Sequence, residues 1–292
     1  MLDFDVVDGK KLRVIIDSDT ACEADDPFAI AYALMSPKLI VKAIVAEHFA
    51  QPGSMGRSRE AALRVTRAMG SDMPVLWGEE GPGETGTLSE GVRFIIDEAR
   101  RQDEHPLFIL CMGALTNVAR ALREAPDIAD RLTIVTIGGH PYDAEEIPFK
   151  EFNFGNDPDA ANQVLQSDAA VWQIPSNVYG SIRVGLAELQ EQVMPFGEIG
   201  QYLFDQMIAY NATPAAFWTQ GESWSLGDSP SVAAVLHPAC GRTVMQTVRH
   251  VNEDTSYSPL PGARKILVYL DLDSRYLLGD FYAKLHLLYP RK

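Results

Sequence analysis

A crowded run of carboxylates near the start of the chain constrains its fold more than any other feature. Residues 14–16 are all β-branched, which is typical of a buried parallel strand. An apolar pattern at helical spacing begins at Phe28. No Lys or Arg lies between Arg13 and Lys38 to balance the acids there, which are Asp17, Asp19, Glu23, Asp25 and Asp26.

This acidic run predicts a metal site. Carboxylates held this close repel one another and raise each other's pKa, so a fold gains from gathering them only around a cation. Carboxylate oxygens at the carboxyl end of a strand are the ligands that hard divalent ions such as Ca²⁺ and Mg²⁺ prefer. An alternative explains part of the run: Asp25 and Asp26 cap the next helix, where carboxylates favour the helix dipole. Capping needs one or two acids, however, and the run holds five.

The composition excludes several classes of protein. A net charge of −15 argues against binding to nucleic acid or to anionic membranes, because phosphate contacts require Lys and Arg. No apolar run reaches the roughly 18 residues of a membrane helix, and we find no apolar signal core, so we expect a cytoplasmic protein. The 292 residues include no obvious linker and no internal repeat, and we expect a single domain over 1–292.

Predicted strands and helices alternate along the first half of the chain. Strands are expected at residues 12–16, 39–46, 74–76, 107–111 and 132–137, and helices at 25–36, 54–69, 88–101 and in a segment ending near 124. This rhythm predicts an α/β fold with a mostly parallel central sheet and helices on both faces. In such sheets ligands bind beyond the carboxyl ends of the strands, and the polar motifs of this chain follow predicted strands.

The second half of the chain predicts a less regular set of elements. They are a polar loop at 141–156, a helix at 157–167, a strand at 171–174, a helical region at 186–222, a loop joined to an apolar helix at 224–236, a strand at 264–270 and an amphipathic helix at 274–289. The helix at 157–167 starts with Asp157 and Pro158, a favourable order for a helix start.

Two strand-to-helix segments offer further groups to a site. Residues 113–117 (Gly-Ala-Leu-Thr-Asn) follow a predicted strand, and their backbone carbonyls or amides can face a ligand. Ordinary helix capping by Thr116 or Asn117 is the alternative there. Asp228 precedes an apolar helix in the same manner, and it is either a ligand or a simple helix cap.

The polar loop around residue 151 has the composition of a sugar-binding segment. Glu151 and Asn153 alternate with Phe152 and Phe154. Carboxylate and amide groups suit the recognition of sugar hydroxyls, and aromatic rings suit stacking on the sugar or base. The alternative is a loop that the two phenylalanines pin to the core.

Together, these motifs resemble the inosine–uridine-preferring nucleoside hydrolase family. The matching segments occur in the family's order and span nearly the whole chain: Asp17-Ser18-Asp19, Asp25-Asp26 with Phe28-Ala29-Ile30, residues 113–117, Ile137-Gly138-Gly139, Glu151-Phe152-Asn153 with Asp157-Pro158, Asp228, and the ending at 268–273. The resemblance implies a Rossmann-like sheet and a Ca²⁺-dependent enzyme of purine or pyrimidine salvage that cleaves the N-glycosidic bond of a ribonucleoside. It also implies a homodimer or a homotetramer.

The resemblance assigns the metal side of the site to four residues. Asp19 would be the general base and also a calcium ligand. Asp26 and Asp228 would be further ligands, and Thr116 would contribute its backbone carbonyl. A general base typically contributes about 10²–10⁴-fold to the rate, so the loss of Asp19 should be severe.

The resemblance assigns the sugar side to a second set of residues. Asp25 and Asn153 would hold ribose hydroxyls, Glu151 would also contact the ribose, and Asp17 would support the acidic loop from behind. A 2′-deoxy substrate would then be poor, because buried polar groups would be left unpaired.

The chain departs from the family pattern in four places, one of which is the absence from residues 142–150 of the amide that the family places shortly before the Glu151 segment. Five residues, 20–24, separate the two acidic pairs, where the family usually has three, so the motif carries a two-residue insertion. Glu47 stands in a region where the family usually places an Asn that binds the site. Gly227 stands where a histidine often precedes the late Asp, a histidine that is a candidate to protonate the leaving base.

Three residues are candidates for the base side of the site. His48 and His140 both follow predicted strands and are candidates to replace the missing acid, and Trp224 is a candidate to stack on the base. The alternative for each histidine is a hydrogen-bonded loop residue.

Two other functions remain open. One is a non-catalytic relative of the same fold that binds calcium and a ribosyl group without turnover. The other is a phosphatase that also begins with Asp-x-Asp after a strand, with Asp271 and Asp273 as its late acidic pair.

Overall fold

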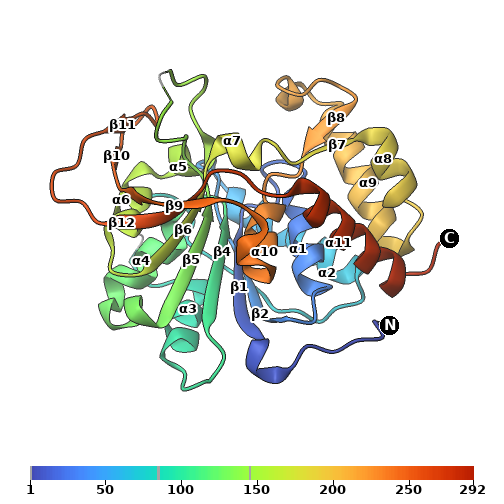
Figure 1. Cartoon of the computed structure of the whole chain (residues 1–292), viewed down its shortest axis with the longest axis horizontal. Coiled ribbons are helices and arrows are strands. Elements are labelled where there is room, and N and C mark those ends of the chain that lie inside the picture. Colours follow the sequence, from blue (N-terminus) through green and yellow to red (C-terminus); the bar gives the residue numbers. More distant parts are fainter. Residues whose placement is uncertain (1, 84–85, 145) are drawn as a thin grey trace.

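A mixed sheet forms the centre of the computed structural model, which describes residues 2–83, 86–144 and 146–292 (Figure 1). Its eight strands are β1 (Leu12–Ser18), β2 (Leu39–Ala46), β3 (Val75–Leu76), β4 (Leu107–Met112), β5 (Leu132–Ile137), β6 (Ala170–Ile174), β9 (Thr243–Thr247) and β12 (Lys265–Tyr269). Their order across the sheet is β3-β2-β1-β4-β5-β6-β12-β9. Neighbours are parallel except β12 and β9, which are antiparallel. The predicted α/β fold with a mostly parallel sheet is confirmed.

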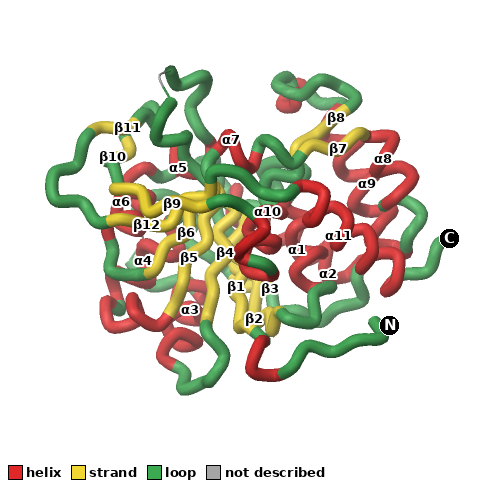
Figure 2. The backbone as a smooth tube through the Cα atoms, in the orientation of Figure 1, coloured by secondary structure: helices red, strands yellow, loops and turns green. Residues whose placement is uncertain are grey.

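Helices cover both faces of this sheet (Figure 2). On one face lie α1 (Asp26–Leu34), α2 (Ser54–Ala68), α9 (Gly197–Asn211), α10 (Ser229–Leu236) and α11 (Ser274–Leu288), and on the other α3 (Glu90–Arg100), α4 (Thr116–Glu124) and α6 (Pro158–Gln166). Val14 and Ile16 of β1 pack into the first core, and Ile15 packs into the second. The split follows from the alternation of side chains along a strand.

The central strands are buried on both faces. All six residues of β4 are buried, as are six of the seven residues of β1. Strands enclosed by two helical layers have near-continuous apolar sequences, and this is why their positions were predictable. In the part of the chain that the structure describes, no helix is long and apolar enough to cross a membrane.

The expected loop at 141–156 was wrong at its end. Residues Phe152–Asn156 form a short helix, α5. The Glu151 carboxylate begins this helix, because it accepts the backbone N–H groups of Asn153 and Phe154. A helix of five residues has too few turns to leave a periodic apolar pattern in the sequence.

The expected helical region at 186–222 was only partly correct. It divides into α8 (Leu186–Gln192) and α9, with a break before Gly197, whose φ of +68° is the left-handed region that favours glycine. After Asn211 the chain leaves the helix. It then forms β8 (Ser223–Ser225), which pairs with β7 (Arg183–Gly185).

Several short elements had no prediction. The edge strand β9 is one, and the small antiparallel pair β10 (His250–Val251) and β11 (Tyr257–Ser258) is another. A four-residue helix, α7 (Ser176–Tyr179), follows β6. These elements are too short or too exposed to produce a clear pattern of apolar residues.

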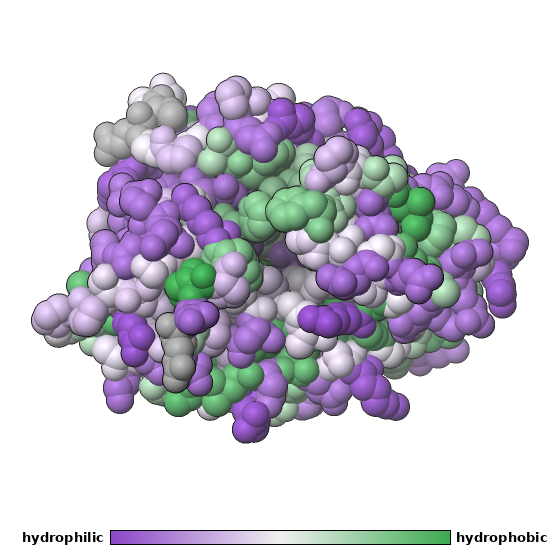
Figure 3. Space-filling view, turned by 90° about the horizontal axis from the view of Figure 1, so that it is seen from above, coloured by the Kyte–Doolittle hydropathy of each residue, from purple (hydrophilic) through white to green (hydrophobic). Residues whose placement is uncertain are grey.

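The carboxyl ends of the parallel strands meet at one end of the molecule. In Figure 1 this end lies at the top, where α5 and α7 follow β5 and β6. Figure 3 looks down on it and shows a surface that is hollowed near its centre. The motifs that follow β1, β4 and β5 in the sequence therefore converge here.

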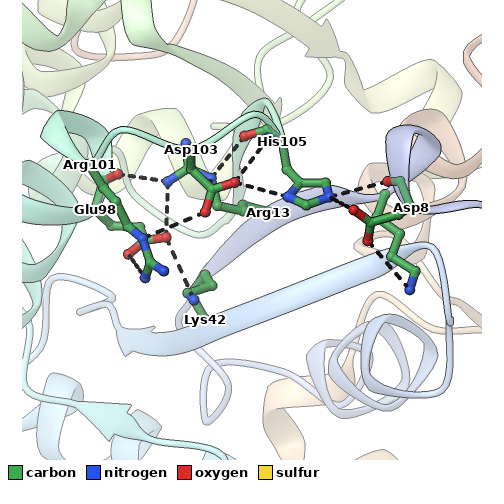
Figure 4. Close-up of polar contacts among 8 residues, drawn as sticks. Asp8, Arg13, Lys42, Glu98, Arg101, Asp103 and His105 are labelled. Atoms are coloured by element: carbon green, nitrogen blue, oxygen red, sulfur yellow. Dashed lines mark hydrogen bonds and ion pairs between the residues drawn. The ribbon is translucent and has the colours of Figure 1, made fainter.

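A network of ion pairs and hydrogen bonds connects β1, β2 and α3 at the opposite end of the sheet (Figure 4). Arg13, at the start of β1, is buried and pairs with Glu98 of α3 at 3.0 Å. Its guanidinium also donates to the backbone carbonyls of Glu98 and His105. Lys42 and Arg101 lie within 4 Å of the same Glu98 carboxylate. These contacts stabilise the fold at the end that carries no site motif.

Candidate active site

Three carboxylates converge at the carboxyl end of β1. Asp25, Asp26 and Asp228 each present an oxygen within 4.8 Å of the other two, and all three are buried. Asp25 and Asp26 begin α1, and Asp228 lies immediately before α10. The side chains of Asp25 and Asp228 make no capping bond to their helices. The capping alternative is therefore wrong for these two residues, and their carboxylates are turned into a common site.

Asp19 lies beside this group. Its carboxyl is 2% exposed, and among the described residues its Oδ2 has no hydrogen-bond partner. The side chain rests on Gly113, where a methyl group would come within 2.9 Å of Asp19 Cγ. The geometric group of three includes Asp25, whereas the resemblance implied Asp19, Asp26 and Asp228 as ligands. An unpaired buried carboxylate oxygen is what a metal ligand without its ion looks like.

Asp26 is held in place by a neighbouring hydroxyl. Ser18 Oγ donates to Asp26 Oδ1 at 2.6 Å, and the same hydroxyl lies 2.6 Å from Thr20 Oγ1. The residue between the two acids of the first motif therefore orients the second acidic pair.

The acidic side chains of the site disfavour one another's charged forms. Burial raises the pKa of Asp19 far above its usual range, and Asp26, Glu23 and Asp25 raise it further. Burial raises the pKa of Asp26 to about 6, and burial with the charge of Asp26 raises that of Glu23 to about 7. Burial raises the pKa of Asp228 well above its usual range, and the charges of Asp25, Asp26 and Asp19 raise it further. No described Lys or Arg forms an ion pair with these carboxylates. Oxygen ligands in this number and charge fit a hard divalent cation.

Hydrogen bonds hold the start of α4 against residues that lie at or after the ends of β1, β2 and β3. Asn117 donates from Nδ2 to Asp17 Oδ1 at 2.8 Å and accepts the backbone N–H of Glu79 at 2.7 Å. The buried Glu47, at the end of β2, accepts the backbone N–H groups of Asn117 and His48. Glu47 therefore positions Asn117, and Asn117 in turn holds Asp17 behind the acidic loop.

A chain of hydrogen bonds holds Thr116 in place and engages both ring nitrogens of His48. The backbone N–H of Ala50 donates to His48 Nδ1, so the ring proton is on Nε2, which lies 2.7 Å from Thr116 Oγ1. Thr116 in turn donates to Asp157 Oδ2 at 2.7 Å. Burial lowers the pKa of His48 to about 4, which keeps the ring neutral. Both ring nitrogens of His48 are thus engaged within the protein.

Glu151 and Asn153 lie at the start of α5. The Glu151 carboxylate accepts the backbone N–H groups of Gly139, Asn153 and Phe154, and also the hydroxyl of Tyr179 at 3.2 Å. Asn153 Nδ2 donates to the carbonyl of Ile137, at the end of β5. Glu151 is therefore a structural anchor of the loop in addition to any contact with substrate.

The remaining predicted residues of the base side are buried. His140 is 1% exposed, and its ring nitrogens lie within 3.3 Å of oxygens of Phe149, Thr255 and Ser176. Trp224, in β8, is 2% exposed and packs against Tyr210 of α9 and against Trp218 in the segment before β8. The ring nitrogens of His140 are engaged within the protein, whereas Trp224 Nε1 is buried and has no hydrogen-bond partner among the described residues.

Four residues of the site had no predicted role. Ser18 and Asn117 stand inside motifs that were recognised, and a search for side chains that orient the acids would have found them. Glu47 was noted only as a departure from the family pattern. Tyr179 had no signal, because it lies in a four-residue helix that had no prediction.

The late acidic pair takes no part in this site. Asp271 pairs with Arg242, which lowers the pKa of the Asp271 carboxyl. Asp273 caps α11 by accepting the backbone N–H of Tyr276. Both acids have structural partners, which removes the feature that favoured a phosphatase.

Comparisons with known proteins agree with this geometry. A family model for inosine-uridine preferring nucleoside hydrolases matches residues 14–274. The pyrimidine-specific ribonucleoside hydrolase RihA of Salmonella paratyphi A is 27% identical over 261 residues, which cover 78% of each chain. An uncharacterised protein of Schizosaccharomyces pombe is 29% identical over 194 residues, which cover 57% of this chain and 62% of that one.

Solved structures show the same fold. A plant nucleoside hydrolase superposes with a TM-score of 0.75 at 20% identity, and a purine-preferring ribonucleoside hydrolase from Gardnerella vaginalis with 0.75 at 22%. In both cases the match covers 94% of this chain and 98% of the other.

Proposed function

The chain belongs to the inosine–uridine-preferring nucleoside hydrolase family, and we propose on this basis that it hydrolyses the N-glycosidic bond of a ribonucleoside in a calcium-dependent reaction. The products are the free base and ribose. The observation that carries the proposal is the group of buried carboxylates at the carboxyl end of β1, which has no cationic partner among the described residues.

The metal side of the proposal rests on oxygen ligands. Asp19, Asp26 and Asp228 would hold the ion, together with the backbone carbonyl of Thr116. A bound divalent ion makes a coordinated water more acidic. Calcium is favoured over softer metals because these ligands are all oxygens. Asp19 then acts as the general base, since its unpaired Oδ2 is available to take the proton of the attacking water.

The sugar side of the proposal rests on Asp25 and Asn153. The Asn153 amide is oriented by its bond to Ile137, which leaves its oxygen to accept a ribose hydroxyl. Departure of the base builds positive charge at C1′ of the ribose. The surrounding carboxylates stabilise this charge more than they stabilise the neutral substrate, and that difference is what accelerates the reaction.

Release of ribose tests the proposal directly. Purified protein is incubated with a panel of ribonucleosides and the matching 2′-deoxynucleosides, with calcium or with a chelator. We expect free ribose from at least one ribonucleoside, little product from its 2′-deoxy form, and loss of activity in the chelator. Absence of ribose from every ribonucleoside with calcium present would refute the proposal.

A second function is favoured by Gly227. Without a side chain at this position the family's usual candidate for a leaving-group acid is absent. A non-catalytic relative would bind calcium and ribose but turn over no ribosyl compound. Calorimetric titration with ribose, run beside the activity panel, separates binding without turnover from catalysis.

The oligomeric state is also part of the proposal. We expect a homodimer or homotetramer, in line with the family resemblance. Exposed apolar side chains on the edge strand β9 and next to it, Val244, Met245 and Leu270, are available for contacts between subunits. Sedimentation analysis that returned a monomer would contradict this expectation.

A further inference from the structure

Tyr179 is placed beside the buried carboxylates by the pairing of two short strands. It is the last residue of α7, which follows β6 at the carboxyl end of the sheet (Figure 1). Soon afterwards β7 pairs with β8, and β8 leads into the turn that contains Gly227 and Asp228. The Ser225 hydroxyl, in β8, donates to the backbone carbonyl of Tyr179 at 3.0 Å. Tyr179 is therefore held against the segment that carries one of the buried acids.

The ring of Tyr179 fills the space in which a side chain of residue 227 would lie. A methyl group on Gly227 would come within 3.3 Å of Cδ2 of this ring and within 3.1 Å of Asp25 Oδ2. Both distances are shorter than ordinary van der Waals contacts. The glycine thus allows the tyrosine ring to pack against the backbone that precedes Asp228, with the Asp25 carboxylate close to the same point.

The hydroxyl at the end of the ring reaches the residue that begins α5. It donates to Glu151 Oε1 at 3.2 Å, whereas O–H···O bonds are typically about 2.7–2.8 Å long. The same carboxylate also accepts three backbone N–H groups, those of Gly139, Asn153 and Phe154. Glu151 therefore keeps three partners when the hydroxyl hydrogen turns to another acceptor, and this makes Tyr179 a donor that is available to a ligand.

Tyr179 also borders the place that the proposed function gives to the ribose. Its ring lies near Asp25 and its hydroxyl lies on Glu151. These are two of the groups that are proposed to contact the sugar. A ribose that touches both carboxylates therefore lies against Tyr179.

The order of the strands puts Tyr179 across the site from the attacking water. The water is assigned to Asp19, which follows β1 and rests on Gly113 in the turn after β4. The strand order is β1-β4-β5-β6, with neighbours about 4.8 Å apart, and Tyr179 follows β6. In a direct displacement the new bond to C1′ forms behind the bond that breaks. The base consequently departs on the side away from Asp19, which is the side of Tyr179.

We propose that Tyr179 is a further catalytic residue, whose hydroxyl donates a hydrogen bond to the nucleobase as the base departs. This inference rests on the function proposed above. The C1′–N bond breaks and its electron pair goes to the nitrogen of the base. Water supplies the hydroxyl to C1′ and gives its proton to the Asp19 carboxylate. The Tyr179 hydroxyl stabilises the negative charge that forms on the base, in the manner of an oxyanion-hole donor.

The tyrosine keeps its own proton in this reaction. Burial above all, and then the charge of Glu151, raises the pKa of Tyr179 well above its usual range, so the hydroxyl stays protonated at neutral pH. The released base takes up a proton from the solvent, and Asp19 returns one to it. The protons of the overall hydrolysis therefore balance.

Tyr179→Phe, assayed with two kinds of riboside, tests the inference. The variant removes the hydroxyl and keeps the ring beside Gly227. Inosine and uridine release a base whose negative charge needs stabilisation, whereas p-nitrophenyl riboside releases a phenolate whose nitro group already disperses the charge. We expect kcat to fall by about 10²-fold for the two nucleosides and by less than about fivefold for p-nitrophenyl riboside.

The matched control is Tyr282→Phe. Tyr282 donates its hydroxyl to Glu188 Oε1 at 3.0 Å, so this variant also removes a tyrosine–glutamate hydrogen bond. The bond joins α11 to α8, and neither helix carries a residue of the site. We expect unchanged kcat for all three ribosides in this control, with a thermal melt of both variants to check that they are folded.

The leaving-group comparison separates the possible outcomes. Equal losses for nucleosides and p-nitrophenyl riboside in Tyr179→Phe would show that the hydroxyl acts only by positioning Glu151, and would overturn the inference. Unchanged nucleoside hydrolysis would overturn it too, and would assign the donor to another group. Release of no ribose by the wild-type protein from any of the three ribosides, with calcium present, would instead refute the proposed hydrolase.

An exchange of side chains between positions 179 and 227 provides a second test. Tyr179→Ala removes the ring and opens the space beside Gly227, and Gly227→His then adds an imidazole donor there. We expect this double variant to hydrolyse uridine at least about tenfold faster than Tyr179→Ala, because a positioned imidazole is an efficient donor. We expect no such gain from Gly227→His alone, since the ring of Tyr179 blocks the imidazole. A double variant no faster than Tyr179→Ala would contradict the placement of Tyr179 on the base side.

Discussion

Asp19 is the residue on which the proposed chemistry depends. Asp19→Asn keeps the size of the side chain but cannot take a proton, so we expect kcat to fall by about 10²–10⁴-fold. The fold should persist, because neutralising one of several repelling acids does not destabilise the metal-free protein. The measurement is ribose release beside a thermal melt, with the exposed Asp72→Asn as control. A kcat within tenfold of wild type would exclude Asp19 as the base.

The buried carboxylates also predict an unusual pH dependence of stability in chelated protein. The pKa of Asp17 is raised by burial to about 7 and that of Asp26 to about 6, from an ordinary value near 3.8. Between pH 4 and 7 the folded state therefore binds more protons than the unfolded state. The free energy of unfolding consequently falls as the pH rises through this window. Urea denaturation at several pH values measures it, and a rise over that range would contradict the assignment.

At this scale the sequence identified the acids but not the residues that orient them. Asp19, Asp25 and Asp26 stand out because charges are conspicuous in an apolar context. Glu151 was read as a sugar ligand, yet it also begins α5 and accepts the hydroxyl of Tyr179. Hydrogen bonds between residues far apart in the chain leave no local pattern.

The turn after β4 is the element that sets the position of Asp19. Gly113→Ala would place a methyl group 2.9 Å from Asp19 Cγ, so the carboxyl must move. We expect weaker calcium binding and at least a tenfold loss of kcat. The matched control is Gly279→Ala on an exposed position of α11, where a methyl group meets nothing within 4 Å. There we expect unchanged activity and a stability gain of about 0.4–1 kcal/mol. Wild-type activity in Gly113→Ala would contradict this role for the turn.

Elements were predictable where burial is uniform and length is sufficient. The strands β1, β2, β4 and β5 are enclosed by helices, and their apolar runs match the structure closely. The region at 186–222 mixes apolar and polar residues along its length, and its composition does not reveal the turn before Gly197. The edge strand β9 is exposed on most of its residues, so it lacks an apolar run.

For the whole molecule, calcium should act as a stabilising ligand. A net charge of −15 and the buried acids both disfavour the compact state, and a bound cation relieves part of the repulsion. At a hundredfold excess over the dissociation constant, binding adds about 2.7 kcal/mol to the free energy of unfolding. We expect calcium to raise the melting temperature, a chelator to reverse it, and Asp228→Asn to abolish the shift. An equal shift in Asp228→Asn would place the ion elsewhere.

The overall architecture was predictable because alternating strands and helices permit few arrangements. Right-handed parallel connections bring the ends of β1, β4 and β5 to one edge, and the motifs follow those strands. Which acids approach most closely was not predictable. The sequence motifs place Asp19 with Asp26, whereas the structure gathers Asp25, Asp26 and Asp228 into the tightest group.

A crystal structure with calcium and ribose tests the central claim most directly. We predict one ion coordinated by carboxylate oxygens of Asp26 and Asp228 at about 2.3–2.6 Å. Asp19 should share the ion and face C1′ of the sugar, with Asp25 on the ribose hydroxyls. An ion bound away from these carboxylates, or ribose bound away from the ion, would contradict the account.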